Sequence, residues 1–92
     1  MKESDLKSTI KGYLLVRGIF NYHLLQGMGS YKGLPDMEMH YKGEVHYLEI
    51  KLPKGVLSEW QKNFQAQCKQ DRVHYHVIRS LEDLLDIIGI GE

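Results

Sequence analysis

Three charged residues on an expected β-hairpin could do chemistry together. Asp36 and Glu49 lie in alternating segments on either side of a turn at residues 42–43 or 43–44, and Lys51 follows two positions later. Because strand side chains alternate between faces, both registers put these three residues on one face, together with Glu38. The first register places Asp36 opposite Glu49. The second places it opposite Lys51 and diagonal to Glu49.

Side-by-side carboxylates of this kind suit a divalent cation. Two like charges about 4 Å apart repel by about 4 kcal/mol at an effective dielectric constant of about 20, and ligation of a cation removes that cost. Carboxylate, carbonyl and water oxygens favour Mg²⁺ or Mn²⁺. Such an ion lowers the pKa of a bound water and neutralises charge on a phosphoryl oxygen, while Lys51 could orient that water. The alternative is a surface hairpin with cross-strand salt bridges worth about 0–1 kcal/mol each.

The elements that must position these residues follow from the apolar spacing and the turn residues. A first helix is expected over residues 4–17, with Ser4 as its N-cap and Gly18 just past its end. A second helix is expected behind a Ser58 cap, and a third begins after a Ser80 cap. The apolar stripe of the second helix consists of Leu57, Trp60, Phe64 and Cys68.

Strands are expected at residues 19–26, 36–41, 45–52 and 73–78, with an irregular glycine-rich loop at 27–33. The resulting order, αβββαβα, predicts a single α/β domain over residues 1–92 with a mixed central sheet flanked by helices. The long connection between the third and fourth strands should be a right-handed crossover.

Composition excludes several classes of protein. The 92 residues are 42% hydrophobic and include a single cysteine, Cys68, which excludes an internal disulfide framework. No apolar run approaches the roughly 20 residues of a membrane span. We therefore expect an intracellular, cytoplasmic domain without a membrane partner.

The net charge of zero is a sum over two unlike regions. All 12 basic residues lie in residues 1–79, with 8 of the 12 acids, a balance of +4. This distribution is compatible with a phosphate-rich partner, although the remaining acids could simply solvate a helix face. Those four acids are Glu82, Asp83, Asp86 and Glu92.

Three short motifs resemble those of one nuclease family. Gly33-Leu34-Pro35-Asp36 is followed by Glu49-Ile50-Lys51 and then by Leu57-Ser58-Glu59-Trp60-Gln61. This series is similar to the virus-type replication-repair nuclease (VRR-Nuc) domain of the PD-(D/E)xK nuclease superfamily. The resemblance covers nearly the whole chain and implies a restriction-endonuclease-like core with the element order given above.

The resemblance also implies an active site and its cation ligands. The catalytic set carried over is Asp36, Glu49, Lys51 and Gln61. The metal ion, Mg²⁺ or Mn²⁺, would be bound by the acids, with Glu3 (or Asp5) from the first helix, and by the carbonyl of Ile50. From its own position, Gln61 lies beside the apolar stripe of its helix and could reach the hairpin face.

The implied activity is metal-dependent hydrolysis of phosphodiesters in branched DNA, such as four-way (Holliday) junctions. We expect a homodimer, because one small chain offers little surface for a junction, and a bacteriophage or bacterial source. The rival interpretation is a DNA-structure-binding module that cuts slowly or not at all. A third interpretation, without nucleic acid, would require Asp36 and Glu49 on different faces of the hairpin.

Other residues suggest contacts around this site. The loop at 27–33 is not a phosphate-binding P-loop, so no nucleotide cofactor is expected. His74 and His76 share a strand face, but spacing places no third nitrogen or sulfur ligand near them, which favours a solvated or partly buried pair. Candidate nucleic-acid contacts are Ser30, Tyr31, Lys32, Lys54 and Lys62.

Overall fold

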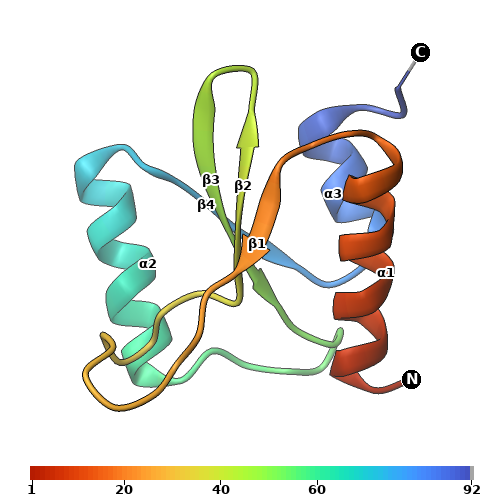
Figure 1. Ribbon diagram of the computed structural model, residues 1–92. Coiled ribbons are helices and arrows are strands. Elements are labelled where there is room, and N and C mark those ends of the chain that lie inside the picture. Colours follow the sequence, from red (N-terminus) through yellow and green to blue (C-terminus); the bar gives the residue numbers. More distant parts are fainter. Residues whose placement is uncertain (92) are drawn as a thin grey trace.

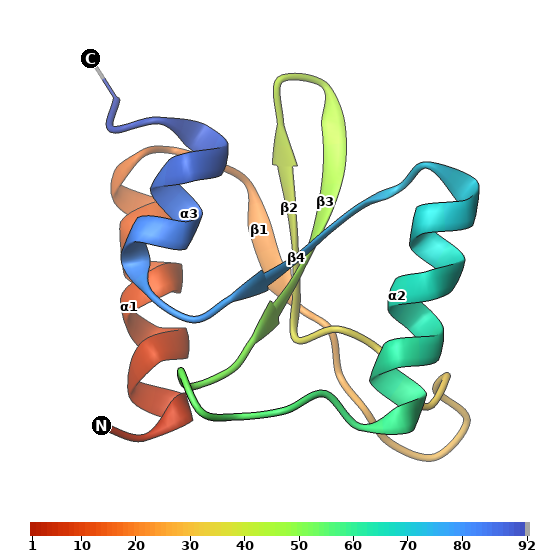
Figure 2. The same ribbon diagram turned by 180° about the vertical axis from the view of Figure 1, so that it is seen from behind.

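A twisted four-stranded sheet lies between α2 on one side and α1 and α3 on the other in the computed structural model, which describes residues 1–91 (Figures 1 and 2). The arrangement is α/β, as expected. Glu92, one of the acids counted at the end of the chain, lies outside the described residues. The elements are α1 (Glu3–Val16), β1 (Asn21–His23), β2 (Met37–Tyr41), β3 (Glu44–Ile50), α2 (Glu59–Asp71), β4 (His74–Ile78) and α3 (Leu81–Ile88).

The sheet is mixed, with its strands in the order β1-β2-β3-β4. β2 pairs antiparallel with both β1 and β3, whereas β4 runs parallel to β3 after the α2 crossover. Tyr41 pairs with Glu44, so Lys42 and Gly43 form a two-residue turn, and their φ values of 51° and 79° are typical of type I′. Met37 pairs with Leu48 further along the hairpin.

The main core lies between the sheet and the pair α1 and α3. α1 buries the side chains that recur at helical spacing, and β2 and β3 bury every second side chain on the facing surface. Burial of each such side chain stabilises the folded state by about 1.5–3 kcal/mol. The core consists of Leu6, Ile10, Leu14, Met37, Met39, Leu48, Ile50, Ile78, Leu84 and Ile88.

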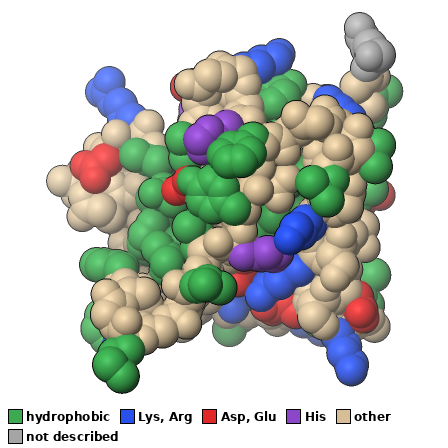
Figure 3. Space-filling model, in the orientation of Figure 1, with side chains coloured by type: hydrophobic (Ala, Val, Ile, Leu, Met, Phe, Trp, Pro, Cys, Tyr) green, Lys and Arg blue, Asp and Glu red, His purple; other side chains and the backbone are tan. Residues whose placement is uncertain are grey.

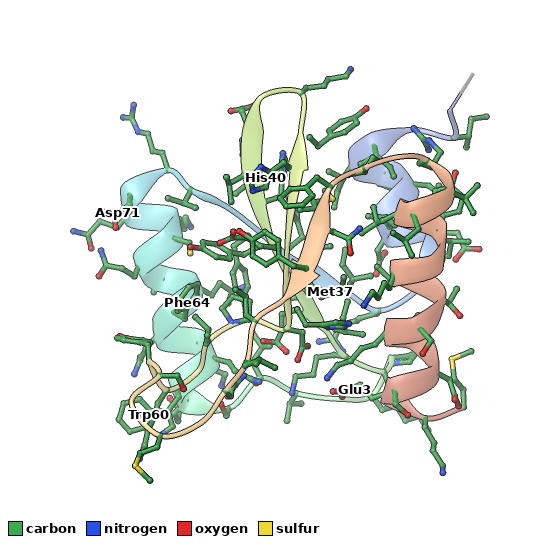
Figure 4. All side chains as sticks on the ribbon, in the orientation of Figure 1. Glu3, Met37, His40, Trp60, Phe64 and Asp71 are labelled. Atoms are coloured by element: carbon green, nitrogen blue, oxygen red, sulfur yellow. The ribbon has the colours of Figure 1, made fainter. Side chains whose placement is uncertain are left out.

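α2 covers the other face of the sheet mainly through Phe64. Its ring packs edge-on against Tyr47, with centroids 5.2 Å apart, and lies 6.0 Å from the ring of Tyr75. The expectation that Trp60 belongs to the buried stripe is wrong, because this residue is 53% exposed. Trp60 lies in the first turn of α2, at the end nearer the β1–β2 loop (Figure 4), and Lys32 Nζ lies 5.0 Å from the centre of its ring.

The helix ends show how local polar groups set the boundaries. α1 begins at Glu3, not behind a Ser4 cap, because the Asp5 carboxylate accepts a hydrogen bond from the Lys2 N–H at 2.9 Å. The expected caps of the other two helices are confirmed, since the side chains of Ser58 and Ser80 accept N–H groups in the first turns of α2 and α3. Within residues 1–91, none of the helices is both long and apolar enough to cross a membrane.

The first strand is much shorter than the expected 19–26. The register pairs residues 21–23 with β2, and one hydrogen bond on each side, His40 N–H to Phe20 O and Leu24 N–H to Asp36 O, flanks them. The strand starts late because the preceding Ile19 N–H still bonds to Leu14 O at the end of α1. The chain after β1 leaves the sheet and runs to the N-terminal end of α2 before returning to β2 (Figure 1). This loop, which joins β1 to β2, therefore contacts the start of α2.

Gly33 fixes the contact between that loop and α2. Its φ is +82°, and a Cβ there would collide with the backbone of Trp60 and lie 2.9 Å from the Gln61 nitrogen. We predict that Gly33→Ala lowers the free energy of unfolding by more than about 2 kcal/mol, through strain and displacement of the loop. Gly27→Ala in the same loop, where a Cβ meets nothing within 4 Å, is the matched control for urea unfolding. Equal stability of the two variants would contradict this role.

Candidate active site

The predicted acids meet where the hairpin leaves the sheet. The residue pair beyond Met37 and Leu48 brings Asp36 opposite Glu49, which is the first of the two expected registers. The N-terminal half of α1 lies alongside, and Figure 4 shows Glu3 at the start of this helix and Met37 at the start of β2. Acidic and basic side chains reach the surface together in this region, between the lower end of the sheet and α1 (Figure 3).

Asp36 is held through both of its carboxylate oxygens. Oδ2 accepts a hydrogen bond from the Ile50 N–H at 2.8 Å, across the hairpin. Oδ1 forms an ion pair with Lys7 Nζ at 3.0 Å. The side chain is 13% exposed, so these partners fix its position against the end of β3. Ile50 therefore contacts the site through its amide N–H.

Glu49 is the most unusual acid of the chain. It is 2% exposed, and its Oε1 atom has no hydrogen-bond partner among residues 1–91. Burial raises the pKa of Glu49 to about 9, and hydrogen bonding with Asp36 and the charge of Asp36 add to the increase, whereas Lys51 opposes it. A buried acceptor without a partner costs about 1–3 kcal/mol, so this oxygen is a candidate ligand atom.

Lys7 belongs to the site but was not found by sequence reasoning. Its ammonium lies between two acids, 3.0 Å from Asp36 and 3.8 Å from Glu3. Burial alone would lower the pKa of Lys7, but the carboxylates of Asp36, Glu3 and Glu49 outweigh it and raise the pKa. The available signal was the spacing of four residues from Glu3, which puts both side chains on one helix face.

Tyr75 was also missed. Its hydroxyl is buried without a hydrogen-bond partner in the described chain. Burial raises the pKa of Tyr75, and the negative charge of Glu49 adds to the increase, so the phenol lies within the field of the acid pair. Pairing with Tyr47 places it on the same sheet face as Glu49, and no spacing rule could have indicated that parallel register.

The two remaining predicted catalytic residues, Lys51 and Gln61, differ in their contacts. The Lys51 side chain runs beside the loop at Gly55, close enough for its charge to act on Glu49. Gln61 uses its side-chain oxygen in a capping box, because Oε1 accepts the Ser58 N–H at 2.8 Å. The structure therefore gives Gln61 a local role at the start of α2, and its catalytic role stays a prediction.

Most of the candidate nucleic-acid contacts lie around the start of α2. The Tyr31 ring packs against Phe64 at 5.9 Å, and Lys32 lies over Trp60. Lys62 Nζ lies 3.5 Å from a Glu59 oxygen. Of the other two, the Ser30 hydroxyl bonds to the Gly27 carbonyl, and Lys54 is exposed in the loop after β3.

The donor atoms of the acid site fit a hard cation incompletely in this conformation. Asp36 and Glu49 supply adjacent carboxyl oxygens, one of them buried and unpartnered. Glu3 instead approaches Asp36 through Lys7. Accordingly, these three acids do not form a close ligand cluster; within residues 1–91, the group of three that does consists of His46, His74 and His76.

The buried Glu49 predicts a pH dependence of stability. The pKa of Glu49 rises from 4.5 to about 9 on folding. The contribution of this residue to the free energy of unfolding is therefore fully present below pH 4.5 and is lost as the pH rises to 9. The free energy of unfolding of Glu49→Gln minus that of wild type should therefore increase by at least ~2 kcal/mol between pH 4.5 and pH 9. Urea unfolding in EDTA measures this difference. Glu82→Gln, an exposed change on α3, should instead run parallel to wild type. A constant difference between Glu49→Gln and wild type would contradict the buried proton.

No family model, curated protein or solved structure matches this chain.

Proposed function

We propose that this chain is a metal-dependent endonuclease that hydrolyses phosphodiester bonds in DNA. The observation that carries the proposal is Glu49, a buried acid with an unpartnered oxygen beside Asp36 and within the field of Lys51. Structural carboxyl groups are rarely left in this state, because burying a polar group without a hydrogen-bond partner costs free energy. Perturbed carboxyl groups cluster at functional sites more often than elsewhere.

Asp36 and Glu49 would hold Mg²⁺ or Mn²⁺, with Glu3 and the Ile50 carbonyl as further oxygen donors. When bound, such an ion supplies an acidified water and neutralises charge on the phosphoryl group. The position of Lys7 indicates that Glu3 becomes available only when the ammonium between Glu3 and Asp36 moves aside.

Several of the chain's own groups would act on the phosphodiester. Lys51 would orient the attacking water and stabilise the charge that develops on the phosphorus oxygens. The Ile50 N–H fixes the position of Asp36, so that this acid is ordered before substrate binds. Lys32 and Lys62 near α2, with Lys54 in the loop after β3, would contact phosphates as point charges without reading sequence.

The finer assignment rests on the resemblance to VRR-Nuc nucleases and on the restriction-endonuclease-like core that it implies. On this basis the substrate would be branched DNA such as a four-way junction. A two-fold homodimer would present two active sites to opposed strands. The source would be a bacteriophage or a bacterium.

One observation favours a second candidate, a module that binds DNA structure without efficient cutting. The Lys7 ammonium already neutralises Asp36 at 3.0 Å, as a cation would. A chain that kept this ion pair permanently would bind phosphates through its lysines and leave the acids unused. A nuclease assay in Mn²⁺ separates the two candidates.

Cleavage of a labelled four-way junction tests the proposal. We expect cutting in Mg²⁺ or Mn²⁺ but not in EDTA, and a loss of about a hundredfold or more in Asp36→Asn and Lys51→Met. The exposed changes Asp86→Asn and Lys11→Met alter the same residue types away from the site and should leave the rate unchanged. Binding of the junction without cutting in Mn²⁺ would favour the module, and cutting that survives Asp36→Asn would refute the assignment.

Stabilisation by Mg²⁺ tests the cation site separately from catalysis. An ion that binds the folded chain alone raises its melting temperature, by about 4 °C or more for each kcal/mol in a domain of this size. We expect this increase in wild type at neutral pH and its loss in Glu49→Gln. Glu82→Gln should keep the full increase. An equal response of Glu49→Gln and wild type would place the ion elsewhere.

A further inference from the structure

A second group of potential ligands lies on the opposite face of the sheet from the acids. His46 is on β3, and His74 and His76 are on the parallel neighbour β4. The register pairs His46 with His74, and alternation puts His76 on the same face. Tyr47 and Glu49 point to the face that α2 covers, so the histidines are separated from the acid pair by the sheet. His46 and Glu49 are also three residues apart on β3, which corresponds to about 10 Å along the strand.

The three imidazoles converge closely. His46 Nδ1 lies 3.0 Å from His76 Nε2, and the rings of His46 and His74 stack 4.2 Å apart at an angle of 10°. One ring nitrogen from each of the three lies within 4.8 Å of the others. Two nitrogens bound to a tetrahedral Zn²⁺ at about 2.0–2.1 Å would be roughly 3.3 Å apart, so only small side-chain movements are needed to close the site.

The surroundings favour the metal-binding form of the ligands. Burial lowers the pKa of His46, and it lowers the pKa of His76 to about 4, with the neighbouring histidines adding to both effects. Both rings are therefore uncharged at neutral pH, which is the state that binds metal ions. Neither ring therefore carries a positive charge that would repel a cation.

Glu44 contacts His74 in the way that carboxylates contact the metal-binding histidines of other proteins. Its Oε1 lies 2.9 Å from His74 Nε2, close enough to orient the ring. A carboxylate that holds one ring nitrogen fixes the tautomer and raises the basicity of the other. The His74 side chain is 41% exposed, so this contact orients a ring that burial alone does not fix.

The group is also accessible from solvent. The His74 side chain is 41% exposed, and His76 is half-buried. Both lie on β4, which is the edge strand of the sheet in the described part of the chain. A hydrated ion can therefore reach the two outer histidines, with the buried His46 as the third ligand.

We propose that His46, His74 and His76 form a binding site for one late first-row divalent cation, such as Zn²⁺, which is independent of the acid site. Three imidazoles suit Zn²⁺, Ni²⁺ or Cu²⁺, whereas Mg²⁺ prefers oxygen ligands. The two faces of the sheet would thus select different metals. Bound Zn²⁺ would tie the start of β4 to β3, since the ligands come from both strands.

Calorimetric titration of the untagged chain with Zn²⁺, in excess Mg²⁺ at neutral pH, tests the site. We expect one Zn²⁺ per chain and a loss of at least tenfold in affinity in His74→Gln and in His76→Gln. His23→Gln, an exposed histidine on β1, is the matched control and should bind as wild type. Asp36→Asn should also retain Zn²⁺ binding, because its carboxylate belongs to the other site.

Co²⁺ in place of Zn²⁺ provides an independent readout, since ligation by three histidines gives visible absorption that His74→Gln should abolish. His74 is partly exposed, so this variant is expected to fold, and circular dichroism checks that it does. Zn²⁺ binding that is unchanged in both histidine variants, lost in Asp36→Asn or absent from wild type would overturn the proposal.

Discussion

The opposition of two carboxyl groups, Asp36 and Glu49, is the constraint on which the rest of the structure depends. Placing a 2%-exposed glutamate beside a second acid costs free energy that an apolar pair would not. The fold limits this cost through the Ile50 N–H and the Lys7 ammonium, which both bind Asp36, and through the high pKa of Glu49. A chain optimised for stability alone has no use for such an arrangement, which is why the proposed function rests on it.

The sheet keeps the two proposed groups of metal ligands apart. Along β3, successive side chains point alternately toward α2 and toward α1 and α3, so Glu49 and His46 lie on different faces. The candidate oxygen donor on β3, Glu49, lies near the end of the strand, close to the start of α1. The candidate nitrogen donor on β3, His46, lies nearer its start and pairs with His74 of β4. One strand thereby contributes to both sites without bringing them together.

Alternation and turn residues were sufficient to predict the hairpin and the shared face of Asp36, Glu49 and Lys51. They left two registers open, because the choice depends on a positive φ at Lys42, which a lysine rarely adopts. The contact of Lys7 with Asp36 was missed because the two residues are distant in sequence, although the spacing of Lys7 from Glu3 is local. His46 was missed because it and His76 are 30 positions apart and meet only through parallel pairing. The cap formed by Ser58 and Gln61, in contrast, has a local signature that the sequence already contained.

The most direct test of the account is an NMR titration of the Glu49 side-chain carboxyl in ¹³C-glutamate-labelled protein, with and without Mg²⁺. Without the ion, the buried acid should titrate far above the ordinary value of 4.5, toward 9. With the ion, the pKa of Glu49 should fall by several units, because a cation on its free oxygen favours the ionised form. An ordinary pKa without Mg²⁺, or a raised pKa that Mg²⁺ leaves unchanged, would contradict the claim that this acid pair is a cation site.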